Sequence, residues 1–114
     1  ASVYCDNAKF ANDVTIPDNT VMYPGQVFTK TWAIKNVGSC DWTSTYKLKF
    51  HDGDKMSGHM QAVGATVVSG DTITISISMV APSTPGTYTG YWKMINDDLN
   101  YFGEMVSVKI IVKE

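Results

Sequence analysis

The chain has 114 residues, a formal net charge of −2, and 18% charged residues against 44% hydrophobic ones. This length suits one domain, and this composition excludes a disordered chain. All nine basic residues are Lys, so the arginine forks and basic surface of a nucleic-acid-binding protein are missing, and no apolar run reaches the roughly 18 residues that membrane insertion requires.

Five runs of alternating apolar and polar residues predict half-buried β-strands. They cover residues 27–36, 46–50, 72–79, 88–94 and 106–112. Clusters of Gly, Pro, Asn, Asp and Ser separate the runs, and no stretch has a helical period. Because each sheet with one apolar face must cover that face, we expect an all-β fold: two stacked antiparallel sheets with seven or more short strands.

Aromatic side chains on the apolar faces are expected to form the core. Trp32 and Trp92 lie in the middle of strands, and Phe28 and Phe50 share the same faces. An exposed aromatic platform for a ligand is the alternative for the two tryptophans. Trp42 stands at the entrance of a strand, where it either closes one end of the sandwich or is exposed.

Two cysteines, Cys5 and Cys40, have no metal-ligand spacing around them. We expect a disulfide between them, and two reduced thiols are the alternative. The bond would tie an N-terminal segment, residues 1–19, to a sandwich domain at 20–114, and closing a loop of about 35 residues stabilises by roughly 4 kcal/mol. A stable disulfide requires an oxidising compartment, so we expect an extracellular or periplasmic setting.

A set of short motifs carries a resemblance to a known family. The motifs are Phe28-x-Lys30-x-Trp32-x-Ile34-x-Asn36-x-Gly38, Trp42, Lys47 to Phe50, Ala81-Pro82, Pro85 to Tyr88, Trp92 and Phe102-Gly103. In this order, over about residues 20–112, they resemble the four-tryptophan (FW) domain of selective-autophagy cargo receptors. The resemblance implies an immunoglobulin-like β-sandwich that binds proteins and carries out no catalysis.

The chain departs from that family pattern in two respects. No Trp stands near Met105, where the fourth tryptophan is expected. The two cysteines are also unlike receptor domains of the reducing cytosol, and they resemble bacterial secreted or lipid-anchored relatives. We therefore expect an extracellular or cell-surface module, with any lipid anchor on a segment that precedes the first residue.

Catalytic and metal-binding constellations are not evident, so we expect no enzyme activity and no cofactor. One loop contains His51, Asp52, Asp54 and His59, which suggests either a metal site or a solvated turn, and we expect the turn because the set is only a fragment of a calcium loop. Ser57 in the same loop lacks the surroundings of an activated nucleophile.

A domain that carries out no catalysis acts by binding through its surface, and loops at the ends of a sandwich are the usual binding sites. Candidate contacts for a protein partner are Leu99, Tyr101, Asp97 and Asp98 in the turn 96–101, Met56 and Met60 in the loop 52–61, and Tyr91. We expect a protein-binding module or a structural spacer in a larger protein. The alternative is a carbohydrate-binding module in which Tyr46, Tyr91 or Tyr101 stacks on sugar rings.

Overall fold

The structure is a computed structural model that describes residues 5–114. It contains eight β-strands, and no helix occurs in this part of the chain. The strands are β1 (Ala8–Asp13), β2 (Thr20–Met22), β3 (Val27–Asn36), β4 (Lys47–Gly53), β5 (Gln61–Ala62), β6 (Thr72–Val80), β7 (Gly86–Ile95) and β8 (Tyr101–Val112). The described residues therefore contain no helix that is long and apolar enough to cross a membrane.

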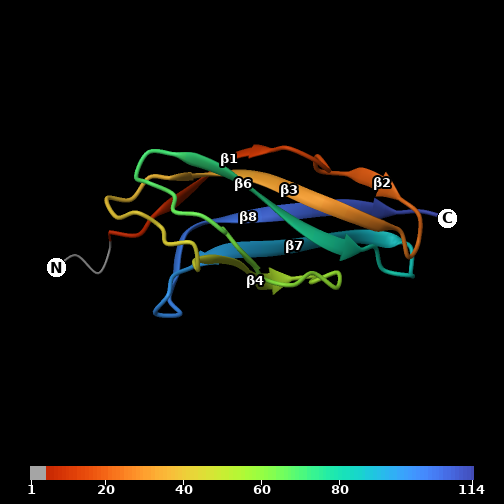
Figure 1. Cartoon of the computed structure of the whole chain (residues 1–114). Helices are drawn as coiled ribbons and strands as arrows, with labels where there is room; N and C mark the ends of the chain where they lie inside the picture. Colours follow the sequence, from red (N-terminus) through yellow and green to blue (C-terminus); the bar gives the residue numbers. More distant parts are fainter. Residues whose placement is uncertain (1–4) are drawn as a thin grey trace.

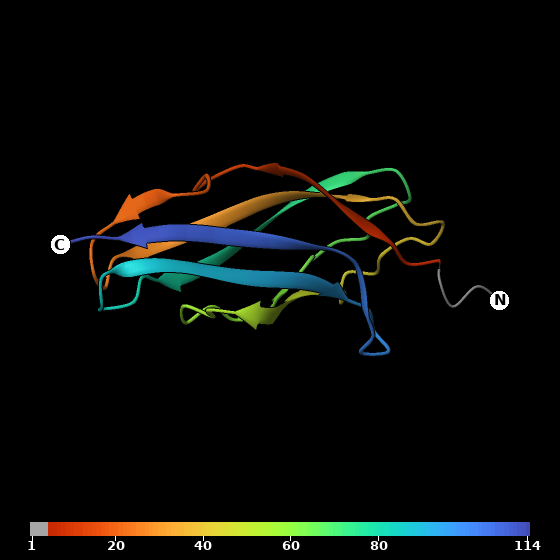
Figure 2. The ribbon, with the colours of Figure 1, turned by 180° about the vertical axis from the view of Figure 1, so that it is seen from behind.

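The strands form two sheets that pack face to face (Figure 1). One sheet has the order β1-β3-β6, and the other has the order β2-β8-β7-β4-β5. Neighbouring strands are antiparallel except β2 and β8, which run parallel. The view from behind shows β8 and β7 side by side along the length of the molecule (Figure 2). The expected immunoglobulin-like sandwich of seven or more strands is confirmed.

The tryptophans fill the space between the sheets, and all three are completely buried. The ring centroids of Trp32 and Trp92 lie 6.3 Å apart, and the indole N–H of Trp32 donates to the carbonyl of Ser107 at 2.8 Å. Trp42 packs edge-on against Phe102 at 5.7 Å, so it closes one end of the core. The core is therefore made of side chains that pack on each other, and the tryptophans offer no ligand platform.

The other two expected core aromatics differ in burial. Phe28 is buried, whereas Phe50 is half-buried and packs edge-on against Trp92 with ring centroids 5.6 Å apart. Phe50 lies beside a register shift in the pairing of β4 with β7, between Phe50 and Asp52. The irregular edge explains why this ring is less covered than the others.

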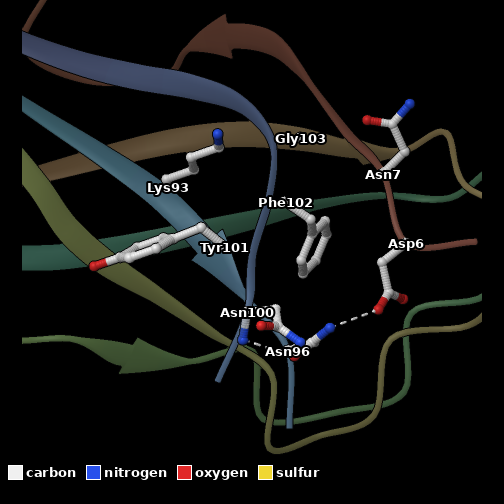
Figure 3. Close-up of a pocket in the computed structure, with 8 residues that line it drawn as sticks. All are labelled: Asp6, Asn7, Lys93, Asn96, Asn100, Tyr101, Phe102 and Gly103. Carbon is white, nitrogen blue, oxygen red and sulfur yellow. Dashed lines mark hydrogen bonds between the residues drawn. The ribbon is translucent and has the colours of Figure 1, made fainter. Parts of the chain in front are cut away.

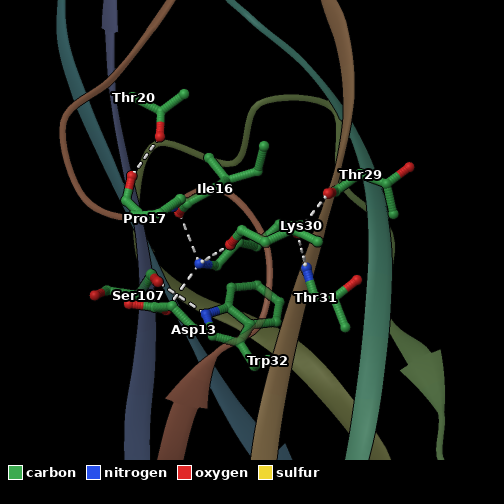
Figure 4. Close-up of polar contacts among 10 residues, drawn as sticks. Asp13, Ile16, Pro17, Thr20, Thr29, Lys30, Thr31, Trp32 and Ser107 are labelled. Carbon is green, nitrogen blue, oxygen red and sulfur yellow. Dashed lines mark hydrogen bonds and ion pairs between the residues drawn. The ribbon is translucent and has the colours of Figure 1, made fainter.

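A buried cation fixes the segment between β1 and β2 (Figure 4). Lys30 lies on the buried face of β3, and its side chain has no exposed surface. Its Nζ donates to Asp13 Oδ1 at 2.8 Å and to the carbonyls of Thr15 and Ile16 at 2.7 and 2.9 Å. It also lies 5.6 Å from the ring centroid of Trp32. Each of the three ammonium hydrogens thus has an acceptor.

The expected disulfide joins Cys5 to Cys40, with Cα atoms 5.2 Å apart. The carbonyl of Cys5 also accepts the N–H groups of Ser39 and Cys40 at 2.9 and 3.2 Å. Gly38 passes so close that an added Cβ would lie 2.1 Å from the same carbonyl oxygen, which explains why this position has no side chain. Residues 1–4 of the expected segment 1–19 lie outside the described residues.

The molecule is a rod of 52 × 22 × 19 Å. The first described residues lie at one end, together with the β7–β8 hairpin, and the C-terminus lies at the other end beside the connection from β2 to β3 (Figure 1). The two ends therefore present different loops.

Candidate interaction site at the β7–β8 hairpin

The turn between β7 and β8 displays one apolar side chain to solvent. Leu99 is 76% exposed, and its φ of +65° lies in the left-handed region, which is costly for a branched side chain. Asn96 holds this geometry, because its Oδ1 accepts the N–H groups of Asp98 and Asn100, both at 3.0 Å. The carbonyl of Asn96 also accepts the N–H of Leu99 at 3.0 Å.

Asp97 ties the same turn to the loop before β4. Its carboxylate accepts the hydroxyl protons of Thr43 and Thr45, each at 2.5 Å. These hydrogen bonds, first that of Thr43 and then that of Thr45, lower the pKa of Asp97 below its usual value. Asp97 is therefore an anchor of the turn, and its exposed neighbour Asp98 is the carboxylate that stays available to a partner.

A shallow hollow of about 590 Å³ adjoins the hairpin (Figure 3). It is lined by Asp6, Asn7, Lys93, Asn96, Asn100, Tyr101, Phe102 and Gly103. In Figure 3, Lys93 and Tyr101 lie on one side of Phe102, and Asp6 and Asn7 lie on the other. The lining thus offers a cation, a carboxylate and several amides around an aromatic floor.

Asp6 is held in place from two directions. It accepts the hydroxyl of Tyr46 at 3.0 Å and the side-chain amide of Asn96 at 3.1 Å. Burial, followed by the hydrogen bond to the carboxylate of Asp6, raises the pKa of Tyr46 to about 12. Tyr46 therefore stays a protonated donor into the alkaline range, and the two hydrogen bonds to Asp6 hold this wall of the hollow in place.

Tyr101 is also engaged by its neighbours. Its hydroxyl donates to the carbonyl of Phe50 at 3.0 Å, and His51 packs edge-on against its ring at 4.9 Å. Lys49 places its ammonium group 6.0 Å from the ring centroid. The side chain of Tyr101 is nevertheless 39% exposed beside the hollow (Figure 3).

The structure brings together only part of the predicted contact set. Leu99, Asp97 and Asp98 share the hairpin turn, and Tyr101 begins β8 directly after it. Tyr91 is exposed farther along β7, opposite Ser107 of β8. The hairpin is therefore the one place where several predicted contacts meet.

The loop 52–61 requires a correction. Met56 was expected on an adaptable surface, but it is buried, and its carbonyl accepts the N–H of Val80 at 2.9 Å. Gly58 packs against Trp92, since an added Cβ would lie 2.7 Å from that ring. Of the two methionines of this loop, Met60 is the exposed one. The loop packs over the edge of the core because its apolar groups extend the buried faces of the sheets.

Two alternatives left open by the sequence concern metals and sugars. No group of three or more His, Cys, Asp or Glu side chains lies close enough to hold a metal ion over residues 5–114. Tyr46, which the alternative hypothesis assigned to stacking on sugar rings, is buried with its hydroxyl bound to Asp6, so that alternative is wrong for Tyr46. Tyr91 and Tyr101 stay partly exposed.

Most of the residues that line the hollow were not predicted as contacts from the sequence. Asp6 and Asn7 carry no signal of their own, and the disulfide at Cys5 brings them to the hairpin. Lys93 had a usable signal: it alternates with the buried Trp92 on β7 and therefore had to face outward.

Comparison with known proteins identifies relatives over most of the chain. Residues 15–112 match a family model described as the Ig-like domain from next to BRCA1 gene. Protein ILRUN of Danio rerio is 34% identical over 107 residues, covering 93% of this chain and 38% of the relative. A protein NBR1 homolog of Arabidopsis thaliana is 33% identical over 110 residues, with 93% and 16% covered.

The next to BRCA1 gene 1 protein of Homo sapiens is 33% identical over 103 residues, covering 88% of this chain and 11% of that protein. The chain thus spans well under half the length of these three relatives. Among solved structures, the CARDB domain of PF1109 from Pyrococcus furiosus aligns over 95% of this chain and 94% of its own, with a TM-score of 0.58 and 11% identity. Part of alpha-2-macroglobulin from Escherichia coli aligns over 98% of this chain and 17% of its own, with a TM-score of 0.63 and 13% identity. These two structures show the fold alone.

The relatives overturn the expected location. An extracellular or cell-surface setting, with or without a lipid anchor, was expected because of the disulfide, but the relatives are cytosolic proteins of animals and plants. The kinship to bacterial secreted proteins has no support among them either. The disulfide between Cys5 and Cys40 therefore does not identify the compartment of this protein.

Proposed function

The chain belongs to the family of the Ig-like domain from next to BRCA1 gene, and we propose that it binds a partner protein through the β7–β8 hairpin without carrying out catalysis. Membership supports interaction as the general role, because the family is one of interaction domains. The hairpin as the contact surface is the specific part of the proposal. We define the hairpin site as the turn 96–100 with the adjoining hollow.

The exposure of Leu99 is the observation that carries this proposal. A strained, left-handed backbone presents its side chain to solvent at the tip of a turn, where most of its surface is exposed. Residues held in strained conformations concentrate at binding sites, and of the non-glycine residues with positive φ in residues 5–114, Leu99 is the one that presents a large apolar side chain to solvent. Because Asn96 and Asp97 fix the turn, little conformational freedom would be lost on binding.

The surroundings of Leu99 specify the chemistry of the partner. An apolar pocket would receive the leucine, and hydrogen-bonding groups around the pocket would meet Asp98 and Asn100. In the hollow, Lys93 and Asp6 offer opposite charges on two sides of an aromatic floor. A partner segment with both an acidic and an amide or basic group fits this arrangement.

The alternative role of carbohydrate binding has less support. Tyr46 is buried, and the ring of Tyr101 is already occupied by His51 and Lys49. A spacer role finds support in the rod shape, since the two ends of the described chain lie far apart. That role needs no binding surface and is compatible with the hairpin site.

Site-specific photo-crosslinking tests the proposal. A photoreactive residue is placed at position 99 of the protein, or at position 23 as a matched control. Tyr23 is 73% exposed and lies in the connection from β2 to β3, at the opposite end of the rod. We expect a protein that is captured at position 99 and not at position 23.

Calorimetry with that purified protein then measures affinity. Leu99→Asp should weaken the Kd at least tenfold, because a charge replaces a central apolar contact, whereas Tyr23→Asp should change it less than twofold. Equal capture at both positions, or equal affinity of Leu99→Asp and the wild type, would show that the hairpin is not the contact surface. Binding to a glycan array that depends on Tyr91 or Tyr101 would favour the carbohydrate alternative.

A further inference from the structure

We propose that two copies of this chain pair through the free edge of β6, antiparallel and centred on Ser76, to form a two-fold dimer. The inference is independent of the hairpin site. β6 is the edge strand of the three-stranded sheet, whereas the hairpin joins β7 and β8 of the five-stranded sheet. It starts from a long strand edge that has no strand beside it within residues 5–114.

β6 pairs on one side only. All nine residues from Thr72 to Val80 are matched with β3 without a register shift, and the sheet order β1-β3-β6 ends there. On the opposite side, the N–H of Val80 donates to the carbonyl of Met56. Since backbone groups of alternate residues point to the same side of a strand, the N–H and C=O groups of Thr74, Ser76 and Ser78 also face this open side.

The other edges of the two sheets are protected in recognised ways. β1 carries Lys9 and Asp13 and has a register shift between Phe10 and Asn12. β2 and β5 have only three and two residues. β6 has neither a charged residue nor Pro, Gly or a bulge in its sequence TITISISMV. Met56 covers this edge at Val80, and the regular, neutral part from Thr74 to Ser78 is open to pairing with another strand.

The edge is complementary to a second copy of itself. With Ser76 opposite Ser76, Thr74 faces Ser78, so exposed hydroxyl side chains meet across the seam and no like charges oppose each other. On the inner face, Ile75 would lie opposite Ile77 of the second copy and extend the apolar layer. A charged peptide from another protein would find no complementary group on this strand, which is why we assign the edge to a second copy.

The arrangement closes on itself. Two-fold pairing uses the β6 edge of both copies and joins two three-stranded sheets into one sheet with the order β1-β3-β6-β6-β3-β1. The edges that remain are short or charged. The expected product is therefore a dimer and not a filament.

Charge-swapped variants test this register. Sedimentation equilibrium over a range from about 5 to 500 μM should show a monomer–dimer equilibrium for the wild type. Ser76→Lys and Ser76→Glu, each alone, should weaken dimerisation at least tenfold, because like charges then meet at the two-fold axis. An equimolar mixture of the two variants should restore the dimer.

Thr29→Lys is the matched control. Thr29 is exposed on the same face of the sheet but lies on β3, beside Ser78 and one strand away from the open edge. This variant should dimerise like the wild type, and thermal melts should show that all variants fold. A wild type that stays monomeric throughout, open-ended oligomers, Ser76→Lys dimers of unchanged affinity, or a mixture that stays monomeric would each overturn the proposal.

Discussion

Lys30 shows how a single residue decides the course of a segment without a long strand of its own. Removing an ammonium group from water costs several kcal/mol, and only a complete set of acceptors offsets that cost. Asp13 supplies the charge, and the carbonyls of Thr15 and Ile16 supply the other two acceptors. The chain between β1 and β2 is therefore held on the sandwich by electrostatics where it has little apolar surface to bury.

The titration of the Tyr46 phenol makes the free energy of unfolding depend on pH in the alkaline range. Its pKa is about 12 in the folded protein against 10.0 in the absence of the fold, so the folded state holds the proton more tightly. The contribution of Tyr46 is complete below pH 10 and is lost as the pH rises toward 12. Urea unfolding between pH 8 and 12 should show a decline in the free energy of unfolding over this window.

Tyr46→Phe is the control for that decline. It lacks the titrating hydroxyl and the hydrogen bond to Asp6. The variant should be less stable at pH 8 and should lose less stability than the wild type between pH 10 and 12. Parallel curves for the two proteins would assign the decline to other groups.

At the scale of elements, the alternation of side chains predicted the long strands well. The bounds of β3 agree with the predicted run 27–36, because every second residue is buried on one continuous face. β8 begins at Tyr101, whereas the pattern predicted a start at Val106. Gly103 has a φ of +77°, and a register shift against β7 at this point exposes Glu104 and Met105 in succession. Such an irregularity erases the period of two that marks a strand.

The short strands and the hollow left no comparable signal. β1 lies at the edge of its sheet and exposes four consecutive residues, Lys9 to Asn12, so it shows no alternation. The hairpin turn was predictable from its Asn and Asp residues. Asp6 reaches this turn through a long-range covalent bond, and a local pattern does not contain that information.

The disulfide connects these elements and should contribute measurably to stability. It closes a loop with a sequence separation of 35, for which the chain-entropy model gives about 4 kcal/mol. Cys5→Ser combined with Cys40→Ser should lower the free energy of unfolding by about this amount in urea titrations. Wild-type protein treated with a reductant should unfold at the same urea concentration as the double variant. A midpoint equal to that of the oxidised wild type would show that the bond adds no stability.

The molecule as a whole has one core, to which the N-terminal segment contributes. We propose that the folding unit includes this segment and is not limited to residues 20–114. β1 supplies the third strand of its sheet, and Ala8 belongs to the core cluster. The segment also carries the acceptors of Lys30.

Deletion of residues 1–19 tests this view. The shortened chain would lack the three acceptors of Lys30 and the strand β1 beside β3, so we expect loss of cooperative thermal unfolding in calorimetry. Lys30→Met in the shortened chain should recover part of the stability, because the uncompensated charge is removed. A shortened chain with the melting temperature of the whole chain would show that residues 20–114 fold by themselves.

The placement of the chain ends determines how the rod would respond to mechanical force. A pull between the first described residues and the C-terminus runs along the strands, since these ends lie at opposite poles (Figure 2). β8 would then slide against β7 and β2, and the hydrogen bonds of the antiparallel β7–β8 pair are perpendicular to that motion. Loaded in shear, these bonds must rupture together, and the Cys5–Cys40 bond prevents the other end from peeling away.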